Sequence, residues 1–153
     1  MPWMNKSTYE QELARNGTLT YVTTGCSMRP FLHSGEDLVH LRAKQPGERF
    51  RKYDVILYRR PSGTYVLHRI VKILPEGYVL CGDNCVVKEP GVSDDWVLAV
   101  LTGVTRGGKA VAIHSRRFRF VIRLWYGFFG PRVLLMKILY RLKSLFRPKG
   151  GRK

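Results

Sequence analysis

The middle of the chain consists of short apolar and β-branched runs separated by turn residues, which is the pattern of an antiparallel sheet. These runs cover residues 38–41, 54–58, 64–73, 78–81, 96–104 and 110–113. Glycine and proline turns divide them at 61–63, 75–77 and 107–108. We therefore expect a mainly β domain, a coiled antiparallel sheet, over residues 18–114, preceded by an N-terminal segment over residues 1–17.

The hydrophobic period changes from two to 3.6 near Ser115, which predicts a helical tail over residues 115–153. In residues 116–129 one side is apolar, with Phe118, Val121, Ile122, Trp125, Phe128 and Phe129, and the other carries Arg116, Arg119 and Arg123. Gly130-Pro131 is expected to break the helix. In residues 132–147 one face carries Leu134, Leu135, Ile138, Leu139, Leu142, Leu145 and Phe146, and the opposite face Arg132, Lys137, Arg141, Lys143 and Arg147.

The charges are as unevenly placed as the apolar residues. All 11 acidic residues precede Trp96, whereas residues 106–153 hold 14 Lys and Arg and no acid. A tail of this composition implies an anionic partner. It is too frequently charged to span a bilayer, which takes about 20 apolar residues, but basic helices with Trp, Phe and Leu are typical of membrane interfaces.

We therefore expect residues 116–147 to bind an anionic membrane surface as a peripheral anchor at the cytoplasmic face, and we do not expect nucleic acid as the partner. The alternative is that the apolar faces pack on the β domain or on each other. Residues 1–20 contain Glu10 and Glu12 and no apolar core of a signal peptide.

Three short motifs carry candidate chemistry. Ser27 lies in the run GCSMRP (25–30), His68 in LHR (67–69) and Asp83 in GDN (82–84). A catalytic serine needs a base within hydrogen-bond reach and a third group that orients the base, and these residues supply a nucleophile, a base and an acid in that order. Asp94 and Asp95 are alternatives for the acid.

The run GCSMRP resembles the Ser-x-Met-x-Pro box of the S24/S26 serine peptidases, the group that contains type I signal peptidases and the LexA-like self-cleaving repressors. The following boxes also resemble that family, in order: Gly35-Glu36-Asp37, Asp54-Val55-Ile56, His68-Arg69-Ile70-Val71 and Gly82-Asp83-Asn84. The resemblance covers about residues 21–106. Many members carry a lysine where this chain has His68, so His68 indicates the Ser/His branch.

The resemblance implies a signal-peptidase-like serine endopeptidase that cleaves a precursor or signal-like peptide after small residues, with the substrate bound as an added strand. Ser27 would be the nucleophile, His68 the base and Asp83 its orienting group. Some relatives have a hydroxyl residue at the position of Gly25 that helps to bind the oxyanion, so backbone N–H groups would take that role here. Met28 is expected to pack into the core behind the turn.

The same residues allow other interpretations. The chain would alternatively be an inactive or regulatory peptidase-like module that binds anionic lipid or nucleic acid through its tail. A self-cleaving regulator is disfavoured because the chain has no Ala-Gly dipeptide. Cys26 is a rival nucleophile, and Cys81 and Cys85 with His33, His40 or His114 are a weak zinc pattern; we expect no metal, no other cofactor and no disulfide framework.

Overall fold

The computed structural model describes residues 8–145, and the chain divides into two compact units, Met1–Ile113 and His114–Lys153. The predictions made for Phe146 and Arg147 lie outside the described residues, as does the first part of the N-terminal segment.

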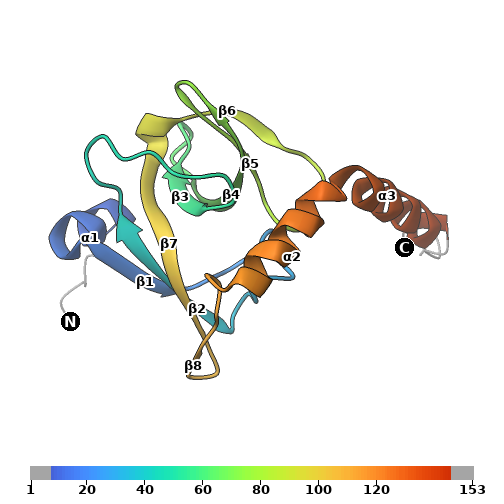
Figure 1. Ribbon diagram of the computed structural model, residues 1–153, viewed down its shortest axis with the longest axis horizontal. Helices are drawn as coiled ribbons and strands as arrows, with labels where there is room; N and C mark the ends of the chain where they lie inside the picture. Colours follow the sequence, from blue (N-terminus) through green and yellow to red (C-terminus); the bar gives the residue numbers. More distant parts are fainter. Residues whose placement is uncertain (1–7, 146–153) are drawn as a thin grey trace, which may run out of the picture. The chain divides into compact units, whose positions relative to one another are not determined.

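The first unit is a mainly β unit whose described strand pairs are all antiparallel, as predicted. Its elements are α1 (Tyr9–Asn16), β1 (Thr18–Val22), β2 (Asp37–Ala43), β3 (Val55–Arg59), β4 (Tyr65–Leu74), β5 (Gly77–Cys81), β6 (Glu89–Ser93), a 3-10 turn (Asp94–Trp96), β7 (Val97–Arg106) and β8 (Lys109–Ala110). The strand order is β1-β2-β7-β3-β4-β5-β6, and β8 pairs with β7 (Figure 1).

Three elements of this unit have no counterpart among the predicted runs. Strand β6 reads Glu-Pro-Gly-Val-Ser, and its proline and glycine conceal a strand from a pattern search. Strand β1 is a five-residue strand at the edge of the sheet. Helix α1 begins at a capping box in which Thr8 and Gln11 bind each other's backbone. The predicted run 110–113 is a strand only at Ala110.

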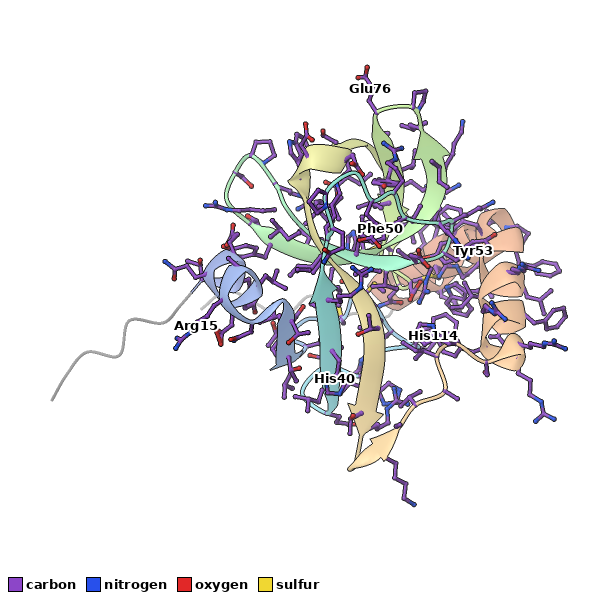
Figure 2. All side chains as sticks on the ribbon, turned by 60° about the vertical axis from the view of Figure 1, so that its left-hand side comes forward. Arg15, His40, Phe50, Tyr53, Glu76 and His114 are labelled. Atoms are coloured by element: carbon purple, nitrogen blue, oxygen red, sulfur yellow. The ribbon has the colours of Figure 1, made fainter. Side chains whose placement is uncertain are left out.

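The main buried cluster of the sheet draws on β3, β4 and β5, which are neighbours in the strand order. Ile56, Tyr58, Ile70, Tyr78 and Leu80 are fully buried there. The loop between β2 and β3 adds Phe50 to the same cluster, and Figure 2 shows its side chain within the sheet, in contrast to Glu76 at the tip of the β4–β5 hairpin. This packing holds β3 and β4 rigidly, and these strands carry part of the candidate site.

A buried ion pair closes the long loop that connects β1 to β2. Asp37, at the start of β2, is completely buried and accepts two hydrogen bonds from Arg106 on β7, both 2.7 Å long. Its carboxylate also accepts the backbone N–H of His33, and Arg106 donates to the carbonyl of Phe31. The pair thus fixes the second half of the loop that contains Ser27.

The second unit contains the two predicted C-terminal helices, α2 (Arg116–Gly127) and α3 (Phe129–Leu145). Ser115 caps α2 by accepting the backbone N–H of Phe118. The break between the helices falls at Phe128, earlier than predicted. Gly130-Pro131 lies in the first turn of α3, where proline is tolerated because the backbone N–H it lacks has no helical partner there.

The side chains of the apolar face predicted for α2 differ in how deeply they are buried. Ile122 is only 2% exposed, and Phe118 and Trp125 are half-buried. Four apolar side chains are exposed here, namely Phe120, Val121, Leu124 and Phe128, of which Val121 and Phe128 belong to the predicted face. In α3 the exposed apolar residues are Leu134, Leu135, Ile138, Leu139 and Leu142. At 100° per residue, Phe120, Leu124 and Phe128 form a ridge next to the arginines of the predicted polar face.

Replacing Asp37 tests how far the Asp37–Arg106 pair stabilises the unit. Asp37→Asn leaves Arg106 without its charge partner, and we expect a loss of about 2–4 kcal/mol in the free energy of unfolding by denaturant at pH 7. Hydrogen bonds from Arg106 lower the pKa of Asp37 below its ordinary value. The carboxylate therefore contributes stability above about pH 4, and the wild type loses that contribution as the pH falls through the lowered pKa.

The exposed carboxylate of Asp95 gives the control. Asp95→Asn is expected to unfold within about 0.5 kcal/mol of the wild type. Equal stability of the Asp37→Asn and Asp95→Asn proteins at pH 7 would show that the buried pair does not hold the loop.

Candidate active site

Ser27 lies in a compact turn between β1 and β2. The turn is closed by backbone hydrogen bonds from Arg29 to the carbonyl of Cys26 and from Leu32 to that of Met28. Gly25 precedes it with a φ of 85°, a left-handed conformation that side-chain-bearing residues rarely adopt. Met28 and Leu32 are buried beneath the turn, which confirms the packing predicted for Met28. The serine is thus held half-buried on a rigid turn.

His68 lies on β4 directly across from Ile56 of β3. Residues 65–68 of β4 pair only with β3, because pairing with β5 begins one residue later, at Arg69 and Cys81. The side chain of His68 is 12% exposed. His68 therefore lies at the end of the part of β4 that pairs with β3 alone. The other edge of β4, at residues 65–68, has no described strand partner.

The loop after β5 brings Ser27 and His68 together. The backbone N–H of Asn84 donates to the carbonyl of Ser27 over 2.7 Å. A side chain on Gly82 would have its Cβ 2.7 Å from that same carbonyl oxygen and 3.0 Å from Nε2 of His68. Glycine is required here by close approach, because the Ser27 carbonyl oxygen and Nε2 of His68 both lie 3.0 Å or less from the point that a Cβ would occupy.

Asp83, the predicted acid, forms a buried ion pair with the residue next to His68. Its two carboxylate oxygens accept hydrogen bonds of 2.8 and 2.7 Å from Arg69. Arg69 also donates to the carbonyl of Tyr53, which has a φ of 78°. Nδ1 of His68 has no hydrogen-bond partner among the described residues, so Asp83 does not orient the ring through that atom; its bonds to Arg69 hold the loop after β5 in place.

The alternative acids lie elsewhere in the fold. The Asp94 carboxylate accepts hydrogen bonds from Lys44 (2.6 Å) and from the Tyr78 hydroxyl (2.7 Å), and so joins β5 to the segment after β2. Asp95 is exposed, and its backbone N–H donates to the hydroxyl of Ser93. The structure does not bring either carboxylate to His68.

The sequence reasoning missed Glu89, the carboxylate that faces the second ring nitrogen of His68. Nδ1 of His68 is buried without a hydrogen bond, and Oε2 of Glu89 lies 4.0 Å from it. Glu89 is held by Arg60, through hydrogen bonds of 2.9 and 2.5 Å, and by the Tyr58 hydroxyl at 2.6 Å. It stands in Lys88-Glu89-Pro90-Gly91, where no motif distinguishes it.

The surroundings of His68 favour a neutral ring. Burial lowers the pKa of His68 below its ordinary value, and the nearby charge of Arg60 acts in the same direction. The negative charges of Glu89 and Asp83 oppose this without reversing it. Hydrogen bonds from Arg60 lower the pKa of Glu89, so that group is ionised. A neutral imidazole near pH 7 can accept a proton at Nε2.

Ser27 and His68 both line a cavity of about 530 Å³. The rest of its wall consists of Tyr9, Tyr21, Thr23, Thr24, Gly25, Met28, Leu32, Leu57, Arg60, Tyr65, Val66 and Leu67. Tyr9 of α1 stacks on Tyr21 and lies against Tyr65, so three tyrosines form one part of the wall. The size lies within the range of ligand pockets, about 300–1,000 Å³, and the open edge of β4 borders it.

Cys26 and Cys85 lie close to the candidate site. Cys26 is exposed beside Ser27, and Sγ of Cys85 lies 2.6 Å from the point that a Cβ on Gly82 would occupy. Among the described residues, no group of three or more His, Cys, Asp and Glu side chains is arranged to hold a metal ion.

Comparisons of the chain with protein-family models, with curated proteins and with solved structures found no significant match. The resemblance to the S24/S26 peptidases therefore rests on the short motifs of this sequence alone.

Replacing Gly82 tests whether Ser27 and His68 meet as described. In Gly82→Ala the new methyl group would overlap the Ser27 carbonyl, so we expect a loss of about 1–3 kcal/mol in the free energy of unfolding. The NMR signals of the His68 ring should shift as well. Gly127→Ala is the control, because nothing lies within 4 Å of a Cβ at that position. An unchanged His68 spectrum in a fully stable Gly82→Ala protein would contradict the geometry.

Proposed function

We propose that this protein is a serine endopeptidase in which Ser27 is the nucleophile and His68 is the general base. The observation that carries the proposal is the position of His68 Nε2, which approaches the Ser27 segment across Gly82 while both residues line one cavity. The lowered pKa of His68 supports it, since the ring is ready to accept a proton near neutral pH.

The chemistry follows from these two side chains. Ser27 Oγ attacks the carbonyl carbon of a peptide bond as its proton passes to Nε2 of His68. The tetrahedral intermediate collapses, the C–N bond breaks, and His68 gives the proton to the leaving amine. Water then attacks the acyl ester, loses a proton to His68, and the ester bond breaks with return of that proton to Ser27. Backbone N–H groups of the turn, including that of Ser27, would stabilise the oxyanion.

The substrate that fits this cavity is an extended peptide. Residues 65–67 of β4 have β3 on one side only, so a peptide can pair with their other edge and reach His68. A preference for small side chains before the cleaved bond, and a precursor or signal-like peptide as substrate, are what the resemblance to the signal peptidases adds to the proposal.

Cleavage of a peptide panel with Ala-x-Ala sites tests this function. The wild type should cleave at least one member, and Ser27→Ala and His68→Ala should each lower kcat/KM by about 10³-fold or more. Cys26→Ala, beside the nucleophile, is the control and should cleave at close to the wild-type rate. Loss of activity in Cys26→Ala with retention in Ser27→Ala would make Cys26 the nucleophile.

The pH profile of the same reaction provides an independent check. Only the neutral form of His68 can accept the serine proton, so kcat/KM should rise with pH. Because burial lowers the pKa of His68, the midpoint of that rise should lie below the ordinary value of about 6.5. A midpoint well above 6.5 would indicate a different base.

We further propose that the helical unit binds an anionic bilayer surface, which would place the protein at the cytoplasmic leaflet. Exposed Phe120, Leu124 and Phe128 adjoin arginines on α2, and α3 adds five exposed apolar residues. No described helix is long and apolar enough to cross a membrane. Exposed apolar side chains beside the net charge of +12 of residues 114–153 suit shallow insertion into an anionic surface better than contact with a phosphate backbone.

Sedimentation with phosphatidylserine-containing vesicles tests this surface. Binding should weaken in high salt but persist in part, because the inserted rings do not depend on charge. The double variant Phe120→Ser, Leu124→Ser should lower the partition coefficient at least tenfold. Val87→Ser removes a 74% exposed apolar side chain from the β unit and should bind as the wild type does. Complete release by salt, with tight binding to DNA, would favour the nucleic-acid-binding alternative.

A further inference from the structure

The motifs suggest Asp83 as the third group of the proposed site, whereas the geometry around His68 favours Glu89. We propose that Glu89 is the positioning residue of His68, holding the ring with Nδ1 toward its carboxylate and Nε2 toward Ser27. This inference rests on the proposed function, and it assigns a role to a residue that no motif marks.

The first argument is the orientation of the ring. Nε2 lies near Gly82 and the Ser27 carbonyl, and Nδ1, on the other side of the ring, lies 4.0 Å from Oε2 of Glu89. Nδ1 is buried and makes no hydrogen bond to any other group, so Glu89 is the acid positioned to receive an Nδ1–H. A shift of about 1 Å upon substrate binding would bring the two atoms to hydrogen-bond distance.

The second argument is that Glu89 is itself held firmly. Arg60 binds its two oxygens, and the Tyr58 hydroxyl donates to the oxygen that faces His68. The ring of Tyr58 lies 6.4 Å from the His68 ring, centre to centre, and packs in the core of the sheet. The carboxylate is therefore fixed by neighbours on the same rigid strands that fix the histidine, as an orienting group must be.

The third argument is the division of roles between the nearby acids. Asp83 is completely buried, with both oxygens bonded to Arg69, so it cannot turn toward His68 without breaking hydrogen bonds to that arginine. Glu89 is partly accessible and borders the site from the start of β6. When His68 takes the serine proton, the imidazolium gains a negative neighbour on its Nδ1 side and so costs less to form.

The charged and titratable groups around His68 define the test. Glu89 comes from β6, Tyr58 from β3, Arg60 from the position just after β3, and Asp83 from the loop after β5. Glu89→Gln keeps the size of the side chain and removes its charge. We expect kcat to fall at least about tenfold with little change in KM, because the loss acts on the transition state.

The pKa of His68, measured by NMR titration of its ring protons, is the second readout. Glu89→Gln removes the negative neighbour and leaves Arg60, so the pKa should fall by about one unit. Glu89→Asp, which keeps the charge, should recover part of both losses. Tyr58→Phe, which removes one group that holds Glu89, should lower kcat in the same direction by a smaller factor.

Glu48→Gln is the matched control, because it breaks a similar two-bond pair, with Arg42, whose residues do not line the cavity. It should leave both kcat and the pKa of His68 unchanged. The inference is overturned if Glu89→Gln cleaves peptides at the wild-type rate, or if its His68 pKa does not move. The titration needs no substrate, so it can fail or succeed separately from the peptidase proposal.

Discussion

The arrangement of this site depends on one constraint, the absence of a side chain at Gly82. The Ser27 carbonyl, Nε2 of His68 and Sγ of Cys85 all approach the point where a Cβ would stand. The segments around Ser27, His68 and Gly82 are far apart in the sequence, and they can approach one another there only because Gly82 has no side chain. The loop is then fixed from both sides, by the Asn84 N–H on Ser27 and by the Asp83 carboxylate on Arg69.

Two of the motif acids, Asp83 and Asp37, have a structural role in the same part of the molecule. Asp83 and Asp37 are both completely buried and both bind an arginine through two hydrogen bonds. One pair anchors the loop that faces His68, and the other closes the loop that holds Ser27. Buried pairs of this kind fix geometry more than they add stability, because desolvation offsets much of their attraction. Their value here lies in positioning two loops, one against β4 and the other against β7.

The sequence predicted the sheet and the two helices because those features are local and periodic. Short apolar and β-branched runs identify β2, β3, β4, β5 and β7. The resemblance carried by the motifs implies that Ser27 and His68 belong to one site. The short strands β1 and β6 were missed, since β6 contains a proline and a glycine. Glu89 was missed for a physical reason as well: its importance comes from the register of β5 and β6, which no residue pattern reports.

The protonation of His68 depends on its burial and on opposing charges that the fold holds close to the ring. The charge of Glu89 favours protonation of the ring, the charge of Arg60 opposes it, and the two groups are bound to each other. Burial then decides the resting state, which is an uncharged imidazole. In the proposed mechanism, a proton that arrives at Nε2 places a positive charge on the ring beside Glu89, whose Oε2 lies 4.0 Å from Nδ1. In the proposed mechanism, a carboxylate that is paired with Arg60 leaves His68 neutral at rest and stabilises its protonated form during turnover.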